Sequence, residues 1–201
     1  AIETIGSGKA CEACYFCRIG QYRHCTDKAE ESGGAFAEYM TRTPLGLHKL
    51  SDNMSWEEGA LVEPLAVSVH AASWGGMQGG DTVAVVGSAT IGLAAIAAAR
   101  ALGARKIVAS ARYPQQKAMA EACGADLVVG SEPGELEDAA QSITDGLGAD
   151  VTIETVGGNS IAPLETACAA TRLQGTVIVV GGFLVTGRML SMFSSGGRKR
   201  S

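Results

Sequence analysis

Apolar, strand-like runs alternate with helix-like runs from about residue 77 onward, and this alternation constrains the fold more than any other feature of the sequence. Strands are expected at 82–86, 106–110, 126–129, 151–155 and 176–180, and helices at 91–102, 115–123, 136–144 and 161–170. Strands that are joined by helical crossovers run parallel, and helices then cover both faces of the sheet. The sequence therefore predicts a doubly wound parallel α/β sheet.

The segments on either side of this pattern are irregular. Residues 1–74 carry cysteine, glycine and proline at short intervals, with short strand-like pieces such as Ala35 to Met40 and no long periodic element. After Phe183 the sheet would need one more helix and strand to be complete, and residues 184–201 show neither. We therefore expect a partial first domain over 1–74, an incomplete α/β domain over 75–183 and an irregular tail, in a chain truncated at both ends.

A glycine-rich turn stands where the first expected strand meets the first expected helix. The sequence GSATIG, from Gly87 to Gly92, resembles the pattern G-x-G-x-x-G with Ala89 in place of the middle glycine. Gly87 permits a tight turn, Ala89 would face a pyrophosphate, and Gly92 allows the helix to approach the sheet. The helix N-terminus, at Thr90 and Ile91, would present free N–H groups to phosphate. The turn predicts dinucleotide binding; the alternative is an α/β turn that serves another ligand.

The end of the second expected strand bears on the choice between NAD and NADP. An acidic residue normally stands there and holds the ribose 2′-hydroxyl, but this chain has Ala111. A carboxylate would repel a 2′-phosphate by up to ~4 kcal/mol. Ser110 and Arg112 instead offer a phosphate a hydroxyl and a fork of N–H donors. We predict a preference for NADP over NAD; the alternative is that Arg112 is a solvated loop residue.

Four of the six cysteines are clustered, at Cys11, Cys14, Cys17 and Cys25. Their spacing, C-x2-C-x2-C-x7-C, lets neighbouring thiolates fold back onto one ion, and four thiolates close a tetrahedron around Zn²⁺ with no open position. The predicted zinc site is therefore structural. Two disulfides or an iron–sulfur cluster are the alternatives, but the C-x3-C-P continuation of ferredoxins is missing. The clustering favours metal binding in a reducing cytoplasm over a disulfide framework.

Taken together, these motifs resemble those of the zinc-dependent medium-chain alcohol and polyol dehydrogenases. The cysteine cluster, the turn at Gly87, the Glu63-Pro64-Leu65 element and the Glu154-Thr155-Val156-Gly157 segment carry the resemblance. They are similar to the sorbitol, threonine and galactitol dehydrogenase branches, over about residues 1–183. The resemblance implies part of a β-rich GroES-like zinc-binding domain followed by an incomplete Rossmann domain.

The resemblance also implies roles for individual residues. Glu63 stands where the family places a ligand of the catalytic zinc, or a residue that hydrogen-bonds the metal-bound water; a helix carboxylate without metal is the alternative. Thr155 and Val156, at the end of the fourth strand, would lie near the nicotinamide ribose. Gly181 and Gly182, after the fifth, would lie near the nicotinamide.

Other expected parts of the family are missing from the sequence. The family's catalytic zinc needs a cysteine and a Gly-His-Glu segment upstream of the cluster, and neither is present. Cys123 and Cys168 would not substitute for that cysteine, because both are expected to be buried, inert thiols. His70 follows Glu63 by seven residues and is expected to pack or to form a hydrogen bond.

The resemblance implies that the intact parent interconverts a secondary alcohol or polyol and a ketone, with zinc as Lewis acid and a nicotinamide cofactor as hydride carrier. Two alternatives stay open: a zinc-free quinone or enoyl reductase of the same fold, and a non-catalytic fragment that binds zinc and a nucleotide. The net charge of −5 gives no general attraction to nucleic acid or anionic lipid. Expected partners are a small-molecule alcohol or ketone and, in the parent, one or three further copies of the chain.

Overall fold

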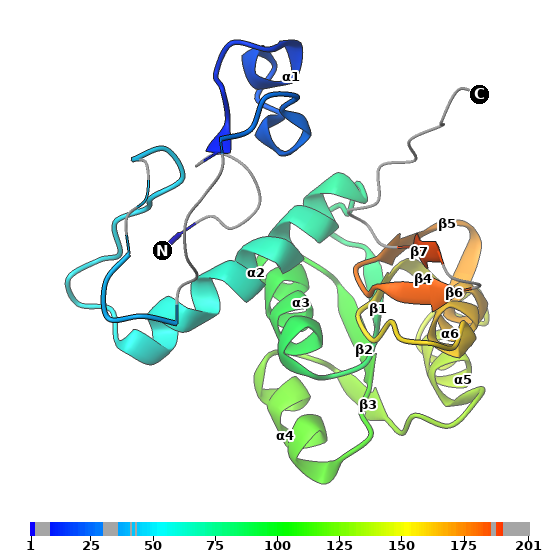
Figure 1. Cartoon of the computed structure of the whole chain (residues 1–201). Coiled ribbons are helices and arrows are strands. Elements are labelled where there is room, and N and C mark those ends of the chain that lie inside the picture. Colours follow the sequence, from blue (N-terminus) through cyan, green and yellow to red (C-terminus); the bar gives the residue numbers. More distant parts are fainter. Residues whose placement is uncertain (3–8, 30–35, 41, 43, 186–187, 191–201) are drawn as a thin grey trace, which may run out of the picture. The chain divides into compact units, whose positions relative to one another are not determined.

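The chain forms two compact units, Ala1–Glu63 and Pro64–Ser201 (Figure 1). The computed structural model describes residues 1–2, 9–29, 36–40, 42, 44–185 and 188–190. Among these residues, no helix is both long enough and apolar enough to cross a bilayer. The boundary between the units lies within helix α2 (Trp56–Trp74). The domain boundaries expected after residues 74 and 183 stay predictions.

A five-stranded sheet is the centre of the second unit. Its strands are β1 (Thr82–Val86), β2 (Lys106–Ser110), β3 (Leu127–Val129), β4 (Ala149–Glu154) and β5 (Thr171–Val179). All neighbouring strands pair in parallel, in the order β3-β2-β1-β4-β5. The chain starts in the middle, at β1, and winds first to one edge and then to the other. The predicted doubly wound sheet is therefore confirmed, and its strand order reverses between β1 and β4.

Helices cover both faces of the sheet (Figure 1). They are α3 (Thr90–Ala101) and α4 (Pro114–Ala122) on one face, and α5 (Glu135–Ser142) and α6 (Ala162–Ala170) on the other. Successive side chains of a strand point to opposite faces. Val83 and Val85 accordingly join the core under α3, whereas Ala84 and Val86 join the core under α5 and α6. Burial on both faces explains why β1 contains no polar residue after Thr82.

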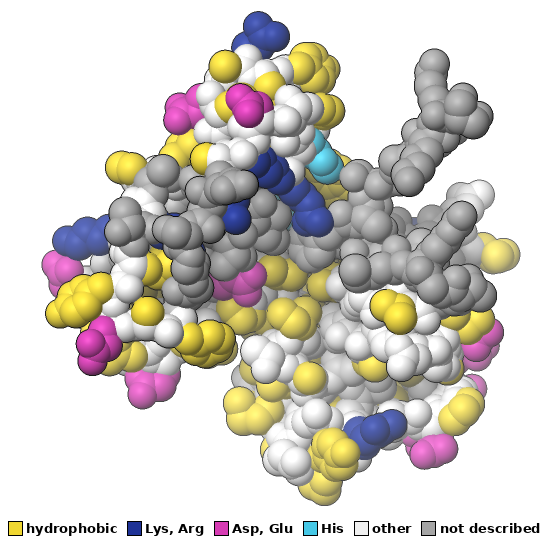
Figure 2. Space-filling model, in the orientation of Figure 1, with side chains coloured by type: hydrophobic (Ala, Val, Ile, Leu, Met, Phe, Trp, Pro, Cys, Tyr) yellow, Lys and Arg dark blue, Asp and Glu magenta, His cyan; other side chains and the backbone are white. Residues whose placement is uncertain are grey.

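Helix α2 is a long element: the sequence suggested a helical setting for Glu63, but no range for this helix was predicted. Its apolar residues lie around the whole circumference, so they show no helical periodicity. A capping box begins the helix: the Ser55 N–H donates to Glu58 Oε2 (2.8 Å), and the Glu58 N–H donates to Ser55 Oγ (3.1 Å). Several apolar side chains of α2 are exposed, Leu61 and Leu65 among them. Figure 2 shows apolar side chains reaching the visible surface at many points.

Two other segments differ from expectation. Residues 36–38 form bends and residues 39–40 are irregular, in place of the strand expected at 35–40, and residue 35 lies outside the described residues. An extended segment becomes a strand only when a neighbouring strand pairs with it, and these residues pair with none that the structure describes. The irregular tail expected from residue 184 instead begins with a hairpin, in which β6 (Phe183–Val185) pairs antiparallel with β7 (Arg188–Leu190). Residues 191–201 lie outside the described residues.

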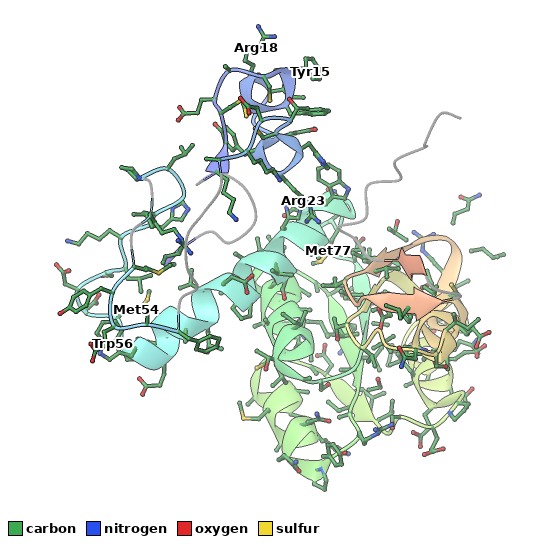
Figure 3. The ribbon with its side chains drawn as sticks, viewed as in Figure 1. Tyr15, Arg18, Arg23, Met54, Trp56 and Met77 are labelled. Carbon is green, nitrogen blue, oxygen red and sulfur yellow. The ribbon has the colours of Figure 1, made fainter. Side chains whose placement is uncertain are left out.

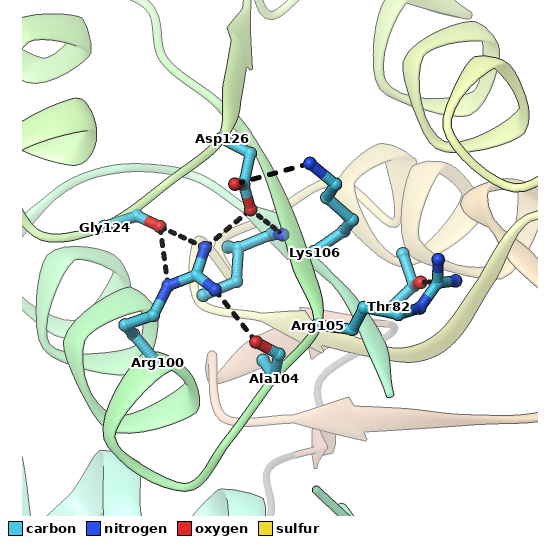
Figure 4. A network of polar contacts seen from close by, with 8 residues as sticks. Thr82, Arg100, Ala104, Arg105, Lys106, Gly124 and Asp126 are labelled. Carbon is cyan, nitrogen blue, oxygen red and sulfur yellow. Dashed lines mark hydrogen bonds and ion pairs between the residues drawn. The ribbon is translucent and has the colours of Figure 1, made fainter. Parts of the chain in front are cut away.

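Two aspartates anchor the amino-terminal ends of the strands. Asp126 accepts hydrogen bonds from the Ile107 N–H (2.7 Å) and from Arg100, and Lys106 Nζ lies 3.8 Å from it (Figure 4). Burial raises the pKa of Asp126, but these donors and cations outweigh it and hold the pKa below its usual value.

Asp150 has an equivalent role at the start of β4. It accepts hydrogen bonds from the Thr82 N–H and from Arg172 Nε, both at 2.7 Å. Burial raises the pKa of Asp150, while the Thr82 amide, Arg172 and Arg105 lower it by more. Asp126, just before β3, therefore joins β2 to α3, and Asp150, within β4, joins β1 to β5.

We expect acid to weaken the sheet through these two carboxylates. Their folded pKa values lie below the unfolded value of about 3.9, so their stabilisation is complete above that pH and is lost as the pH falls through the folded pKa. Asp126→Asn with Asp150→Asn should cost on the order of 1 kcal/mol per site at pH 7, discounted for partial exposure, and should flatten the acid slope. Urea midpoints at pH 7, 4 and 3 test this. Asp145→Asn, at an exposed turn, is the control; an unchanged slope in the double variant would contradict the prediction.

Candidate functional site

The β1–α3 turn has the backbone geometry of a phosphate-binding turn. Gly87 has φ = +89°, in the left-handed region that favours glycine. A Cβ at Gly92 would lie 1.9 Å from the Gly87 carbonyl oxygen, so a larger residue would push α3 away from the turn. Ala89 and Thr90 are exposed, and no side chain caps the first turn of α3, which continues through Ile91. The amides of this first turn therefore face solvent, where an anion can bind them.

The residues after β2 divide between structural and exposed positions. The Gly87 N–H donates to Ser110 Oγ (3.0 Å), and Ser88 Oγ donates to the Ser110 carbonyl (2.8 Å). Ser110 is only 5% exposed, and Ala111 is buried as well. The Ser110 hydroxyl, which was predicted to bind a phosphate, therefore holds the glycine turn. Arg112 is exposed.

The end of β4 packs directly on the glycine turn. Thr155 Oγ1 donates to the Val86 carbonyl at 2.8 Å and lies 3.3 Å from the Gly87 carbonyl oxygen. A Cβ at Gly87 would come within 2.5 Å of Val156 Cγ2. The predicted ribose-side residues thus lie against the predicted phosphate turn, at the point where the strand order reverses. In open α/β sheets, ligands bind at this crevice beyond the carboxyl ends of the strands.

The two glycines after β5 lie against the same loop. The Gly158 N–H donates to the Gly182 carbonyl at 2.8 Å. A Cβ at Gly157 would lie 2.5 Å from the Gly182 oxygen, and a Cβ at Gly181 would lie 2.4 Å from the Gly157 nitrogen. The structure therefore brings together Gly87–Gly92, Thr155–Val156 and Gly181–Gly182. It adds Glu154, a fully buried acid to which the sequence reading gave no role. The feature of the sequence that could have identified Glu154 is an acidic residue at the end of an apolar strand.

The four clustered cysteines lie close enough to hold one metal ion. Their Sγ atoms are all within 4.8 Å of one another, with 3.5 Å between Cys14 and Cys17 and 4.0 Å between Cys11 and Cys17. Tetrahedral zinc with sulfur ligands at ~2.3 Å requires sulfur–sulfur edges of roughly 3.8 Å. All four cysteines are free, so the described lobe has no disulfide among them. The donor set and its dimensions fit a structural zinc.

Two short helical segments, α1 (Tyr15–Arg18) and η2 (Tyr22–His24), position these cysteines. Tyr15 and Arg18 project outward from this lobe, so the sulfurs, and not these larger side chains, occupy its centre (Figure 3). The lobe therefore has little apolar packing of its own to hold it.

Backbone amides favour the thiolate form of two of these cysteines, which is the form that binds a cation. The amides of Thr26 and Cys17 lower the pKa of Cys14 to about 6, and the Cys11 amide, which donates to Cys25 Sγ at 3.3 Å, lowers the pKa of Cys25. Burial raises the pKa of Cys17 to about 12. The amide donors favour thiolates at Cys14 and Cys25, and thiolate is the form that binds zinc.

The remaining candidates have different surroundings. Glu63 is exposed on α2, and among the described residues only the four cysteines gather as a group able to hold a metal. His70 contacts Trp74, with ring centroids 5.5 Å apart, as its expected packing role requires. The expectation of a buried Cys168 was wrong: α6 turns Ala167 and Ala170 to the core, and Cys168 lies on the exposed side. Cys123 is partly buried, against the core under α3 and α4.

Comparison with known proteins identifies the family. The family model described as "Zinc-binding dehydrogenase" matches residues 90–200, which is more than half of the chain. The chain belongs to this family. The zinc-binding dehydrogenase described here is 33% identical to sorbitol dehydrogenase of Bacillus subtilis over 182 residues, which cover 89% of this chain and 51% of that protein. The chain spans about half the length of the curated relatives it matches.

Solved structures of the family have the same fold. The alcohol dehydrogenase TADH of Thermus sp. ATN1 superposes with a TM-score of 0.71 and 30% identity, over 88% of this chain and 54% of that one. A zinc-binding dehydrogenase of Sinorhizobium meliloti, solved with bound NADP, gives a TM-score of 0.71 and 29% identity, over 92% of this chain and 55% of that one. The predicted fold class, a Rossmann sheet with part of a GroES-like zinc-binding domain, is confirmed.

We expect this zinc-binding dehydrogenase to carry one Zn²⁺ per chain on the cysteine cluster. Cys14→Ser and Cys25→Ser should each lose most of it, because a neutral hydroxyl is a poor replacement for a thiolate. Metal analysis by mass spectrometry after gel filtration measures the stoichiometry. Cys168→Ser, at an exposed position on α6, is the control and should keep its zinc. Full zinc in both cluster variants would refute the assignment.

Proposed function

We propose that this chain is the nucleotide-binding part and the structural zinc lobe of an oxidoreductase that transfers hydride between a secondary alcohol or polyol and a nicotinamide dinucleotide. The observation that carries the proposal is the crevice at the strand-order reversal. There, an uncapped helix start, a glycine turn and the ends of β4 and β5 lie in direct contact. Relatives named sorbitol dehydrogenase, erythritol/L-threitol dehydrogenase and L-idonate 5-dehydrogenase support the polyol class.

Each part of the crevice has a separate task in this proposal. The amides at Ala89, Thr90 and Ile91 bind the diphosphate, because a helix start carries unpaired donors and a positive dipole end. Thr155 and Val156 would contact the nicotinamide ribose, and Gly181 and Gly182 leave room for the ring. When bound, the dinucleotide supplies hydride chemistry at its nicotinamide. The protein contributes by holding that ring in one position relative to a substrate.

The preference for NADP depends on Arg112 in this proposal. Ala111 leaves the end of β2 without a carboxylate, and the exposed Arg112 supplies a guanidinium suited to a phosphate. Ser110 contributes indirectly, because its hydroxyl holds Gly87 in place. The NADP complex of the Sinorhizobium meliloti relative is consistent with this preference.

The described residues do not form a catalytic zinc site. Glu63 has no second metal ligand near it in the part of the chain that the structure describes, so we derive no step through a second zinc. In the whole protein, Glu63 would be a zinc ligand or a partner of the metal-bound water. The same observation favours a second candidate for the chain by itself, which is binding of zinc and nucleotide without turnover. We propose a homodimer or homotetramer for the whole protein from the family resemblance, and a cytoplasmic location from the clustering of its cysteines.

Binding of NADPH to the chain tests the proposed function. Ala89→Asp should raise the NADPH dissociation constant at least tenfold, because it places a carboxylate beside the diphosphate. It should not lower the melting temperature, because aspartate is a favourable residue at a helix N-cap. Ala89→Asn, which has the same shape without the charge, is the matched control and should bind more tightly than Ala89→Asp. Nicotinamide fluorescence measures binding; equal affinities of the parent and Ala89→Asp would contradict diphosphate binding at this turn.

The cofactor preference is tested separately. Arg112→Ser should weaken NADPH binding about tenfold or more, since a charge-assisted hydrogen bond contributes roughly 1.5–3 kcal/mol, and should leave NADH affinity nearly unchanged. Titration of both cofactors against the parent and the variant measures this. The control is Lys49→Ser, which removes an exposed cation that is distant from Arg112 in the sequence. Tighter binding of NADH than of NADPH by the parent would overturn the preference.

A further inference from the structure

Glu154 is a fully buried acidic residue at the carboxyl end of β4, and none of the roles above uses it. Its Oε1 accepts two successive backbone hydrogen bonds, from the Val156 N–H (2.6 Å) and the Gly157 N–H (2.8 Å). These two amides lie in the loop that contacts the glycine turn. One carboxyl oxygen thus fixes the direction in which the chain leaves β4.

The second carboxyl oxygen of Glu154, Oε2, distinguishes this residue from a buried polar group whose hydrogen bonds are all satisfied. Glu154 Oε2 is buried and has no hydrogen-bond partner among the described residues. Burying a polar atom without a partner costs free energy, which offsets part of the stabilisation from the two amide hydrogen bonds at Oε1. Those two hydrogen bonds need only Oε1, so they do not account for the second buried oxygen.

The unpartnered oxygen lies against the second loop of the crevice. A Cβ at Gly181 would lie 2.5 Å from Glu154 Oε2, so the carboxyl group fills the space that a side chain at 181 would need. The backbone of Glu154 pairs with the same segment, because its carbonyl accepts from the Val180 N–H (2.9 Å) and the Gly181 N–H (3.2 Å). The side chain of Glu154 thus contacts both loops that border the nicotinamide end of the crevice.

We propose that Glu154 is a positioning residue that sets the spacing of the loops after β4 and β5, and thereby the affinity for the nicotinamide half of the dinucleotide. The inference rests on the proposed function, because it assigns these loops to that half. Glu154 does not touch the cofactor: it acts through Val156, Gly157 and Gly181. The adenosine half and the diphosphate bind at the β1–α3 turn and the end of β2. Glu154 makes no described side-chain hydrogen bond there and reaches the turn only through the packing of Val156 on Gly87.

The test compares two probes, NADPH and ADP, because ADP lacks the nicotinamide half. Glu154→Ala removes the acceptor of two amides and should weaken NADPH binding tenfold or more while changing ADP affinity less than twofold. Glu154→Gln keeps one carbonyl acceptor and should restore at least half of the lost NADPH affinity on a logarithmic scale. Glu165→Ala, which removes an exposed acid from α6, is the matched control and should match the parent for both probes.

The outcomes separate this inference from the proposed function. If the parent binds neither NADPH nor ADP, the proposed function fails. If the parent binds both and Glu154→Ala weakens both equally, or weakens neither, Glu154 has no positioning role. Amide hydrogen exchange gives a second measurement, for the case that Glu154→Ala does not fold. In folded Glu154→Gln the Val156 and Gly157 amides should stay protected, and rapid exchange of both in the parent would overturn the proposal.

Discussion

The contact of α3 with the end of β1 is the constraint on which the rest of the crevice depends. Gly92 lies so close to the Gly87 carbonyl that a Cβ would be 1.9 Å from that oxygen. Because of this close approach, the start of α3 lies at the carboxyl end of the sheet. Gly87, in the left-handed region, is then also contacted by Val156 at the end of β4. A bulkier residue at either position would push the helix away from the strand. The amides of the first turn of α3 would then have no fixed position relative to the sheet.

Successive loops of the crevice support one another through backbone atoms more than through side chains. Val156 packs on Gly87, Gly157 packs on Gly182, and Glu154 and Gly157 together occupy the space beside Gly181. Gly87, Gly157 and Gly181 are required because a neighbouring loop has taken the volume that a side chain would need, whereas a Cβ at Gly182 would meet nothing within 4 Å. Apolar cores on both faces of the sheet hold the strands that carry these loops. Precision at the site thus results from close backbone packing on a rigid sheet.

The sequence specifies the regular part of the fold well. The ends of β1 and β2 were predicted to the residue, because β-branched runs between glycine turns permit little else. The extent of helix α2 was not predicted, since apolar residues on all its sides remove the periodic signal, although Ser55 and Glu58 form a capping box that is readable in the sequence. The proposed site residues on loops were chosen by motif, but the engagement of the Ser110 hydroxyl with Gly87 depends on tertiary contacts that no local pattern carries. The exposure of Cys168 was missed for a similar reason, because an alanine-rich helix does not reveal which side faces the sheet.

The cysteine lobe and the sheet are stabilised by different chemistry. Two apolar cores hold the sheet together, whereas the described part of the lobe gathers its sulfurs around a common centre. Oxidants such as peroxide attack thiolates and leave alkyl side chains intact, so oxidative stress would loosen the lobe well before it disturbed the sheet. Oxidative damage would then disorder the cysteine lobe locally, while the nucleotide crevice kept its structure.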